Sequence, residues 1–184
     1  MTHLGTVQLE TERLILRRFT AADDAAMFEN WASDDDMTEF MSWPTHTSID
    51  TSRGVLNDWI ANYEKLDYYQ WAMELKRCGT LIGAIGVVGS KEKIKMIEMG
   101  YGIGKAWWRK GYTSEALVRL LTFFFEDVGM NRVEAVHDTR NPGSGKVMEK
   151  SGLRYEGTLR EAGLNNQGVC DKALYAMLAK DYFN

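Results

Sequence analysis

The chain has 184 residues, 45% of them hydrophobic and 26% charged, which is typical of one soluble globular domain with a complete core. Its formal net charge of −4 excludes a surface that attracts nucleic acid or anionic lipid as a whole, so an anion site needs a local group of basic residues. The only cysteines, Cys78 and Cys170, provide neither a disulfide framework nor a zinc motif, and no apolar run is long enough to cross a membrane. We expect a cytoplasmic protein with a single domain over residues 1–184 and no metal.

The first half of the chain predicts a strand, helices and then three strands. Thr20 is a suitable N-cap for the first helix, and apolar residues at helical spacing define the second. The segments KRCG and SKEKIK have the composition of hairpin turns between the three strands. The predicted elements are a strand at 13–19, helices at 21–32 and 48–65, and strands at 68–75, 80–89 and 96–104.

The second half predicts helices that alternate with strands. Its elements are a helix at 113–128, a strand at 132–138, a short helix at 141–152, and a final pair of strands at 153–159 and 170–178. Together with the three consecutive strands of the first half, this order indicates an α/β (α+β) domain. We expect a central mixed, mostly antiparallel sheet that is flanked by helices.

A basic turn stands directly before the helix at 113–128, in the stretch WWRKGYTSEALVRLL. Helix starts leave backbone N–H groups unpaired and carry partial positive charge, so they bind phosphate well. A glycine lets the backbone approach the ligand closely, and two basic side chains add full charges. This predicts a pyrophosphate cradle; the alternative is a solvated basic turn that caps an ordinary helix. The cradle would consist of Arg109, Lys110, Gly111, Tyr112, Thr113 and Ser114.

The strand before this turn, EMGYGIG, is rich in glycine. In a regular strand Glu98, Gly100, Gly102 and Gly104 share one face, which would leave a bare lane. An extended ligand with amide groups could lie in that lane, or against the edge of the strand as an additional strand. The alternative is that the glycines relieve packing against a bulky neighbour. With the cradle, the lane describes a ligand with an amide-bearing arm and a diphosphate, as in coenzyme A, and we expect Gly102 and Ile103 to contact it.

Two motifs and the order of elements resemble the GNAT superfamily of acetyl-CoA N-acyltransferases, most closely the branch that acetylates ribosomal-protein N-termini. The resemblance runs from about Thr11 to Phe183. In WRKGYT, Trp108 takes the first place of the family's phosphate motif, Gly111 the glycine place and Thr113 the last small place. The second motif is matched in NPGSGKVMEKSGL by Asn141, Ser144, Val147, Lys150 and Gly152. The resemblance implies acetyl transfer from acetyl-CoA to an amine by direct attack in a ternary complex.

The attack releases a proton, so a nearby base would help. The resemblance makes Glu98 the candidate, because some family members hold a glutamate base at the start of the glycine strand; the alternative is a surface glutamate that pairs with a lysine. Other members carry the base five residues before the asparagine, where this chain has Val136. His137 is the rival, since imidazole titrates near neutrality, but a histidine on an apolar face is more often a core residue.

The resemblance also bears on the departing thiolate and on the coenzyme. The tyrosine that many relatives use as an acid is replaced by Met148, which leaves Ser144 as the candidate donor or as a first-turn serine that only satisfies the helix start. Asn141 could bind the coenzyme's arm or cap the short helix. Lys146 could reach the 3′-phosphate or remain solvated.

The acceptor amine is the least defined part of the site. Several aromatic residues and the acidic run DDD at 34–36 gather in the N-terminal helical part, which would suit a cationic amine, although both features are more often structural. We expect a protein N-terminal amine. The alternatives are a small-molecule amine, such as an aminoglycoside or a polyamine, and a coenzyme-A-binding module without catalysis. A homodimer remains open.

Overall fold

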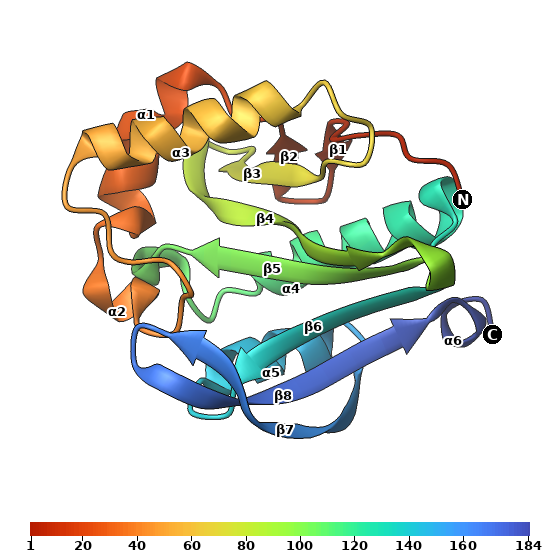
Figure 1. Cartoon of the computed structure of the whole chain (residues 1–184). Coiled ribbons are helices and arrows are strands. Elements are labelled where there is room, and N and C mark those ends of the chain that lie inside the picture. The colour runs from red at the N-terminus through yellow and green to blue at the C-terminus, as the bar shows by residue number, and fades with distance from the viewer.

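The computed structural model, which describes residues 1–184, contains one eight-stranded sheet in the order β1-β2-β3-β4-β5-β6-β8-β7 (Figure 1). Strands β5 and β6 are parallel, and every other neighbouring pair is antiparallel. The predicted mixed, mostly antiparallel sheet is therefore confirmed. The strands are β1 Leu9–Glu10, β2 Leu14–Arg17, β3 Gln70–Leu75, β4 Thr80–Lys91, β5 Met96–Ile103, β6 Arg132–Asp138, β7 Arg154–Asn165 and β8 Gly168–Leu178.

The helices lie where the sequence places them, with short additions. They are α1 Asp24–Met27, α2 Asp35–Thr38, α3 Ile49–Asn62, α4 Tyr112–Thr122, α5 Pro142–Lys150 and α6 Ala179–Tyr182. The π-helical segments Phe28–Ala32 and Phe123–Val128 continue α1 and α4. The sequence did not predict β1, α2 or α6, because two-residue strands and four-residue helices are too short to show a periodicity.

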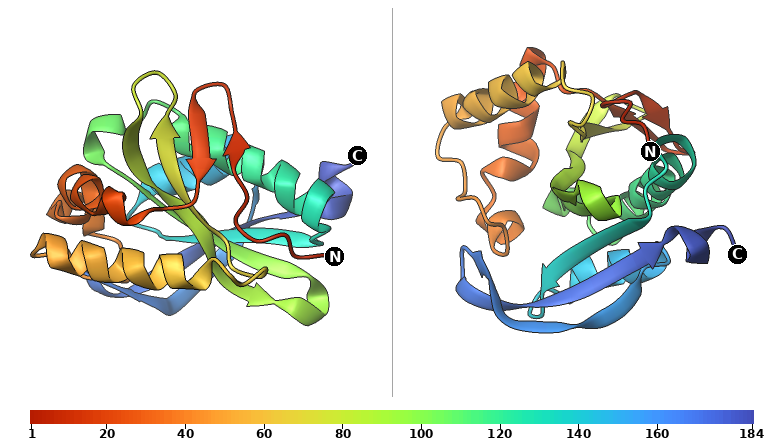
Figure 2. Two further views of the ribbon diagram at one scale, coloured as in Figure 1. Left: turned by 90° about the horizontal axis from the view of Figure 1, so that it is seen from above. Right: turned by 45° about the vertical axis from the view of Figure 1, so that its right-hand side comes forward.

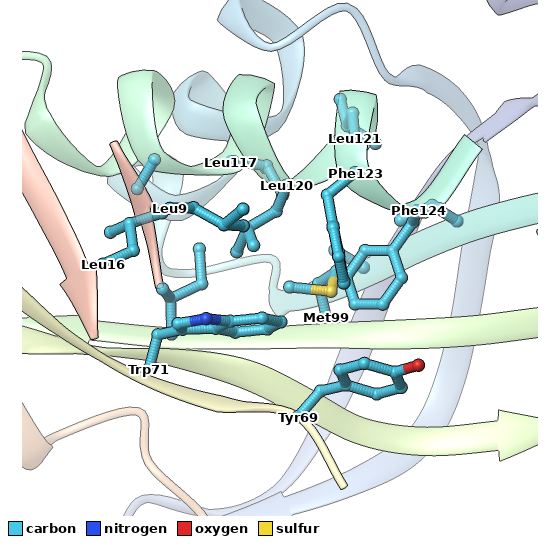
Figure 3. Packing of buried hydrophobic residues seen from close by; sticks show 14 of the residues in the cluster. Leu9, Leu16, Tyr69, Trp71, Met99, Leu117, Leu120, Leu121, Phe123 and Phe124 are labelled. Carbon is cyan, nitrogen blue, oxygen red and sulfur yellow. The ribbon is translucent and has the colours of Figure 1, made fainter. Parts of the chain in front are cut away.

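Hydrophobic residues form two cores. In the larger one, Leu117, Leu120 and Phe124 of α4 and its π-helical continuation pack against Trp71 of β3 and Tyr69, which directly precedes β3 (Figure 3). The smaller core, which includes Trp31 and Leu56, lies under α1 and α3. Figure 2 (left) shows α3 and α4 on opposite sides of the strands. No helix has the length and apolar character that crossing a membrane requires.

The centre of the sheet opens between β5 and β6. Their pairing begins at Met96 with Arg132 and ends at Met99 with Ala135, so the rest of β5 diverges from β6 (Figure 1). Strand β5 stays paired with β4 as far as Ile103, across a bulge at Val88. From Gly100 onward, the edge of β5 that faces β6 therefore has no strand partner.

Candidate active site

A cavity of about 640 Å³ lies at this opening. One part of its wall comes from β5, β6, the first turn of α5 and the β7–β8 hairpin, and includes Glu98, Tyr101 and Ser144. The other part comes from the N-terminal helices and β4, and is mostly apolar. The sequence-predicted Glu98, Gly102, Asn141 and Ser144 all line this one cavity, so the fold brings these four residues together.

The basic turn leads into α4 through left-handed backbone. Gly111 is the N-cap of α4 with φ 82°, and no side chain caps this helix start. The amide of Glu115 donates to the Gly111 carbonyl at 3.0 Å, so this bond closes the first turn and the preceding amides point outward from the helix. These amides, from Gly111 to Ser114, are the groups that the predicted cradle would use.

The two basic side chains of the turn differ in their contacts. Lys110 donates from Nζ to the Ala106 carbonyl at 2.8 Å, while Arg109 is exposed and has φ 60°. A residue that the sequence analysis missed stands beside the turn: the Arg13 guanidinium lies 4.4 Å from the centre of the Tyr112 ring and donates to Glu115 Oε2 at 2.6 Å. Arg13, which directly precedes β2, thus connects the start of α4 to this edge of the sheet. No motif marks such a long-range pair.

The predicted lane of glycines is not bare, although Gly100 and Gly102 line the cavity. A Cβ on Gly100 would meet Val88 Cγ1 at 2.6 Å, and one on Gly102 would collide with Met37 of α2. Gly104 lies outside β5 and packs against Trp107. The glycines therefore relieve packing, which was the alternative interpretation. What remains open to an extended ligand is the unpaired edge of β5 from Gly100 to Ile103, although Trp108 already occupies the Ile103 carbonyl through an indole N–H bond of 2.8 Å.

Glu98 is half-buried on β5, where it lines the cavity. It stands opposite Gly89 on β4 and Glu134 on β6. Its side chain forms no ion pair with Lys93 or Lys95, so the surface pairing that was the alternative is absent. Glu98 thus lies where the pairing of β5 with β6 ends and the cavity begins.

Ser144 lies in the first turn of α5 and meets a tyrosine. Tyr101 Oη lies 3.0 Å from Ser144 Oγ and donates to the Ser144 carbonyl at 3.0 Å. Burial raises the pKa of the Tyr101 phenol, an effect that the hydrogen bond with Ser144 partly offsets. A tyrosine hydroxyl is therefore present although Met148, at the place where relatives have one, is buried in the core. Tyr101 sits between two lane glycines in the sequence, and only the fold shows that it reaches α5.

The remaining candidate residues, Asn141, Lys146 and His137, lie in or near α5. Asn141 caps α5, since its Oδ1 accepts from the Ser144 amide at 3.3 Å. Lys146 is exposed. His137 is half-buried and lines the cavity; its Nδ1 lies 2.7 Å from the Asp138 carbonyl, and its Nε2 is buried against Gly145 without a hydrogen-bond partner. An Nδ1–H donor leaves Nε2 with a lone pair in an apolar surrounding.

Asp138 anchors the floor of the cavity. Its carboxylate accepts from Arg140 Nη2 at 2.6 Å and from Asn165 Nδ2 at 2.8 Å. The hydrogen bond from Arg140 holds the pKa of Asp138 far below its usual range. The contact with Asn165 ties β6 to the hairpin of β7 and β8.

Replacing Asp138 with asparagine is expected to destabilise the fold by about 1 kcal/mol at pH 7, since Arg140 is half-exposed and its ion pair is screened. For a chain of this size, this corresponds to roughly 2–4 °C in Tm. The pKa of Asp138 is lower in the folded state, so its stabilisation is present above the unfolded value of about 3.9 and is lost as the pH falls. Thermal melts at pH 7 and pH 3 should show the gap narrowing at pH 3; an unchanged gap would contradict this role.

The tip of the β7–β8 hairpin contacts the N-terminal helical part. Asn166 donates from Nδ2 to the carbonyls of Thr38 at 2.8 Å and Trp43 at 2.9 Å. Its backbone amide donates to the Met41 carbonyl at 3.1 Å. These bonds join the two sides of the cavity, so the hairpin limits the size of what can enter from this end.

Comparison with protein families matches residues 13–154 to the acetyltransferase (GNAT) domain. Among curated proteins, the uncharacterized N-acetyltransferase YoaA of Bacillus subtilis strain 168 is 31% identical over 170 residues, which cover 92% of this chain and 96% of that protein.

Solved structures share the fold. The ribosomal-protein-S5-alanine acetyltransferase of Vibrio fischeri superposes with a TM-score of 0.82 at 17% identity, over 96% of this chain and 98% of that one. The microcin C7 self-immunity acetyltransferase MccE, solved with acetyl-CoA and AMP, superposes with a TM-score of 0.81 at 17% identity, over 91% of this chain and 93% of that one.

Proposed function

The chain belongs to the acetyltransferase (GNAT) family, and from this premise we propose that it transfers the acetyl group of acetyl-CoA to a primary amine held in the cavity. The observation that carries the proposal is the combination of an uncapped helix start at Gly111 with the unpaired edge of β5. The first offers N–H groups to a diphosphate, and the second offers backbone partners to an amide-bearing arm.

The residues of the chain fit the coenzyme. The cradle from Arg109 to Ser114 would hold the diphosphate, and Gly102 with Ile103 would hold the arm. A Cβ on Gly111 would come within 3.4 Å of Arg13 Nη2. The absence of a side chain at Gly111 therefore keeps the space between the turn and Arg13 open to a ligand. Asn141 and Lys146 complete the proposed set, with Asn141 acting through the start of α5. Bound acetyl-CoA supplies the acetyl group as a thioester.

Glu98 is proposed as the general base. A free amine is required for attack, and an N-terminal amine has a reference pKa of about 7.7–8.0, so much of it carries a proton at neutral pH. The Glu98 carboxylate in the cavity would accept the proton that leaves the amine nitrogen. His137 is a poorer candidate, because its free nitrogen faces Gly145 in a buried position.

Ser144 is proposed to assist the departing thiolate. The Ser144 hydroxyl would donate a hydrogen bond to the sulfur, and the Tyr101 hydroxyl, 3.0 Å from Ser144 Oγ, would hold that hydroxyl in position. The thiolate would take its proton from solvent, so that neither hydroxyl group is left deprotonated.

The contact between Tyr101 and Ser144 predicts non-additive effects. Ser144→Ala is expected to lower kcat roughly 10-fold to 100-fold and Tyr101→Phe roughly 3-fold to 10-fold, with acetyl-CoA affinity unchanged. Because Tyr101 acts only through the Ser144 hydroxyl, the double variant should be little worse than Ser144→Ala. Thiol release measured for the four proteins tests this; effects that multiply would show that the two hydroxyls act independently.

For the acceptor, we propose the N-terminal amine of a protein. The family membership supports a primary amine, and a structural neighbour is a ribosomal-protein-S5-alanine acetyltransferase. A second candidate, a small-molecule amine, is favoured by the hairpin tip, since the bonds of Asn166 narrow the cavity. Incubation of the protein with acetyl-CoA and a cell extract, followed by mass spectrometry, decides between them: acetylated protein N-termini support the first, and acetylated metabolites alone support the second.

A further inference from the structure

The acceptor side of the cavity has a wall of aromatic rings. Trp43, Trp59 and Tyr68 line it and are half-buried. Each has another ring nearby: Trp59 and Phe19 are 5.0 Å apart between centroids, and Tyr68 and Tyr63 are 5.7 Å apart. Such contacts hold large side chains in place, so the wall is already built before a ligand arrives.

The lining of the cavity as a whole carries little negative charge. Glu98 and Asp138 are the only acidic residues that line the cavity. Asp138 is already bound by Arg140 and Asn165, and Lys172 adds a positive charge to the lining. Only the Glu98 carboxylate is therefore available to a cationic ligand.

The acidic run at 34–36 does not change this balance. Asp34 caps α2 by accepting from the Asp36 amide at 2.9 Å, and Asp36 forms an ion pair with Lys105. None of the three aspartates lines the cavity. The acidic mouth that the sequence suggested is thus absent, and its charges serve the local structure of α2 instead.

His46 also lines the acceptor side of the cavity. Its Nδ1 lies 2.8 Å from Ser52 Oγ, and burial lowers the pKa of the imidazole. The ring lies 5.3 Å from that of Trp43. His46 therefore extends the aromatic wall and adds no negative charge to it.

From these observations we propose that the acceptor is an amine with one positive charge and a bulky apolar body, an aromatic ring or a branched aliphatic chain, next to the reacting nitrogen. The apolar body would pack on Trp43, Trp59 and Val55 while Glu98 receives the amine. A polyamine or an aminoglycoside would bring a second ammonium group to a wall that has ring faces but no carboxylate, and a ring face offsets the loss of water around a charge only in part. The inference rests on the proposed acetyl transfer and specifies its acceptor.

Two matched series of acceptors test the proposal on the wild-type protein with acetyl-CoA, by thiol release and mass spectrometry. The first compares phenethylamine with spermidine, and the second compares peptides that differ only in a first residue of phenylalanine, leucine, serine or lysine. We expect kcat/KM at least about tenfold higher for phenethylamine, or for the peptides that begin with phenylalanine or leucine. The series in which this preference is observed shows whether the acceptor is a free small amine or the N-terminus of a peptide. Spermidine, or the serine and lysine peptides, reacting equally well or better would overturn the proposal.

A charge placed in the wall should change the preference. Val55→Asp adds a carboxylate to the lining, whereas Asn57→Asp adds one to the exposed surface of the same helix. We expect Val55→Asp to raise spermidine use and lower phenethylamine use by at least about tenfold relative to Asn57→Asp. Unchanged preference would contradict the assignment of the wall.

The outcomes separate this inference from the function on which it rests. Turnover with the wrong acceptors refutes only the inference. A protein that binds acetyl-CoA but acetylates no amine in either series refutes acetyl transfer itself.

Discussion

Replacing Gly111 with glutamate is expected to weaken acetyl-CoA binding by at least about 100-fold, or about 2.7 kcal/mol. Two effects act in the same direction. Gly111 has φ 82°, a conformation that residues with a side chain rarely adopt. A carboxylate at the N-terminus of α4 would also repel the diphosphate and compete for the N–H groups. Isothermal titration calorimetry with acetyl-CoA measures the loss.

The opposite end of the same helical segment provides the control. Gly129 follows the π-helical end of α4 and has φ 80°, so Gly129→Glu introduces comparable backbone strain and the same charge far from the cradle. It should lower the melting temperature but retain acetyl-CoA binding. Equal loss of binding in both variants would mean that the effect of Gly111→Glu comes from unfolding.

Replacing Glu98 with glutamine is expected to lower kcat by roughly 10²-fold to 10⁴-fold, the usual contribution of a general base. The amide has nearly the same shape but cannot accept the proton. Acetyl-CoA affinity should not change, because Glu98 precedes the unpaired edge of β5 that is proposed to hold the arm of the coenzyme. Steady-state kinetics with a saturating amine measures kcat, and calorimetry measures the affinity.

A second glutamate variant controls for the loss of charge. Glu92 precedes β5 and lies outside the cavity, where it contacts His3 at 3.1 Å. Glu92→Gln should leave kcat within a factor of two of the wild type. If Glu98→Gln turned over at the wild-type rate while binding acetyl-CoA normally, the proton would have to leave by another route, such as a water molecule.

The order of elements could be predicted from the sequence, because it depends on local signals. Hydrophobic periodicity identified the helix that begins near Gly111 and the strand at 132–138, and the turns between the central strands have distinct compositions. The opening between β5 and β6 could not be predicted in this way. It depends on where pairing stops, after Met99, and nothing local in the sequence marks that residue.

The candidate site was predicted only in part. Alternation correctly placed Glu98 and Gly102 on one face, but it could not show that the Met37 and Val88 side chains approach the glycines of that face from other elements. The contact of Tyr101 with Ser144 joins residues 43 positions apart, so motif spacing missed it. The acidic residues at 34–36 resembled a binding mouth because the ion pair of Asp36 with Lys105 also joins residues that are remote in the sequence.

The most direct test of the account is a pair of calorimetric titrations of the wild-type protein, one with acetyl-CoA and one with acetyl-pantetheine, which has the same thioester arm but no diphosphate. If the start of α4 holds the diphosphate, acetyl-CoA will give a saturable heat with one site per chain, and acetyl-pantetheine will bind about 100-fold more weakly. No heat with acetyl-CoA, or equal affinities for the two compounds, would contradict the account.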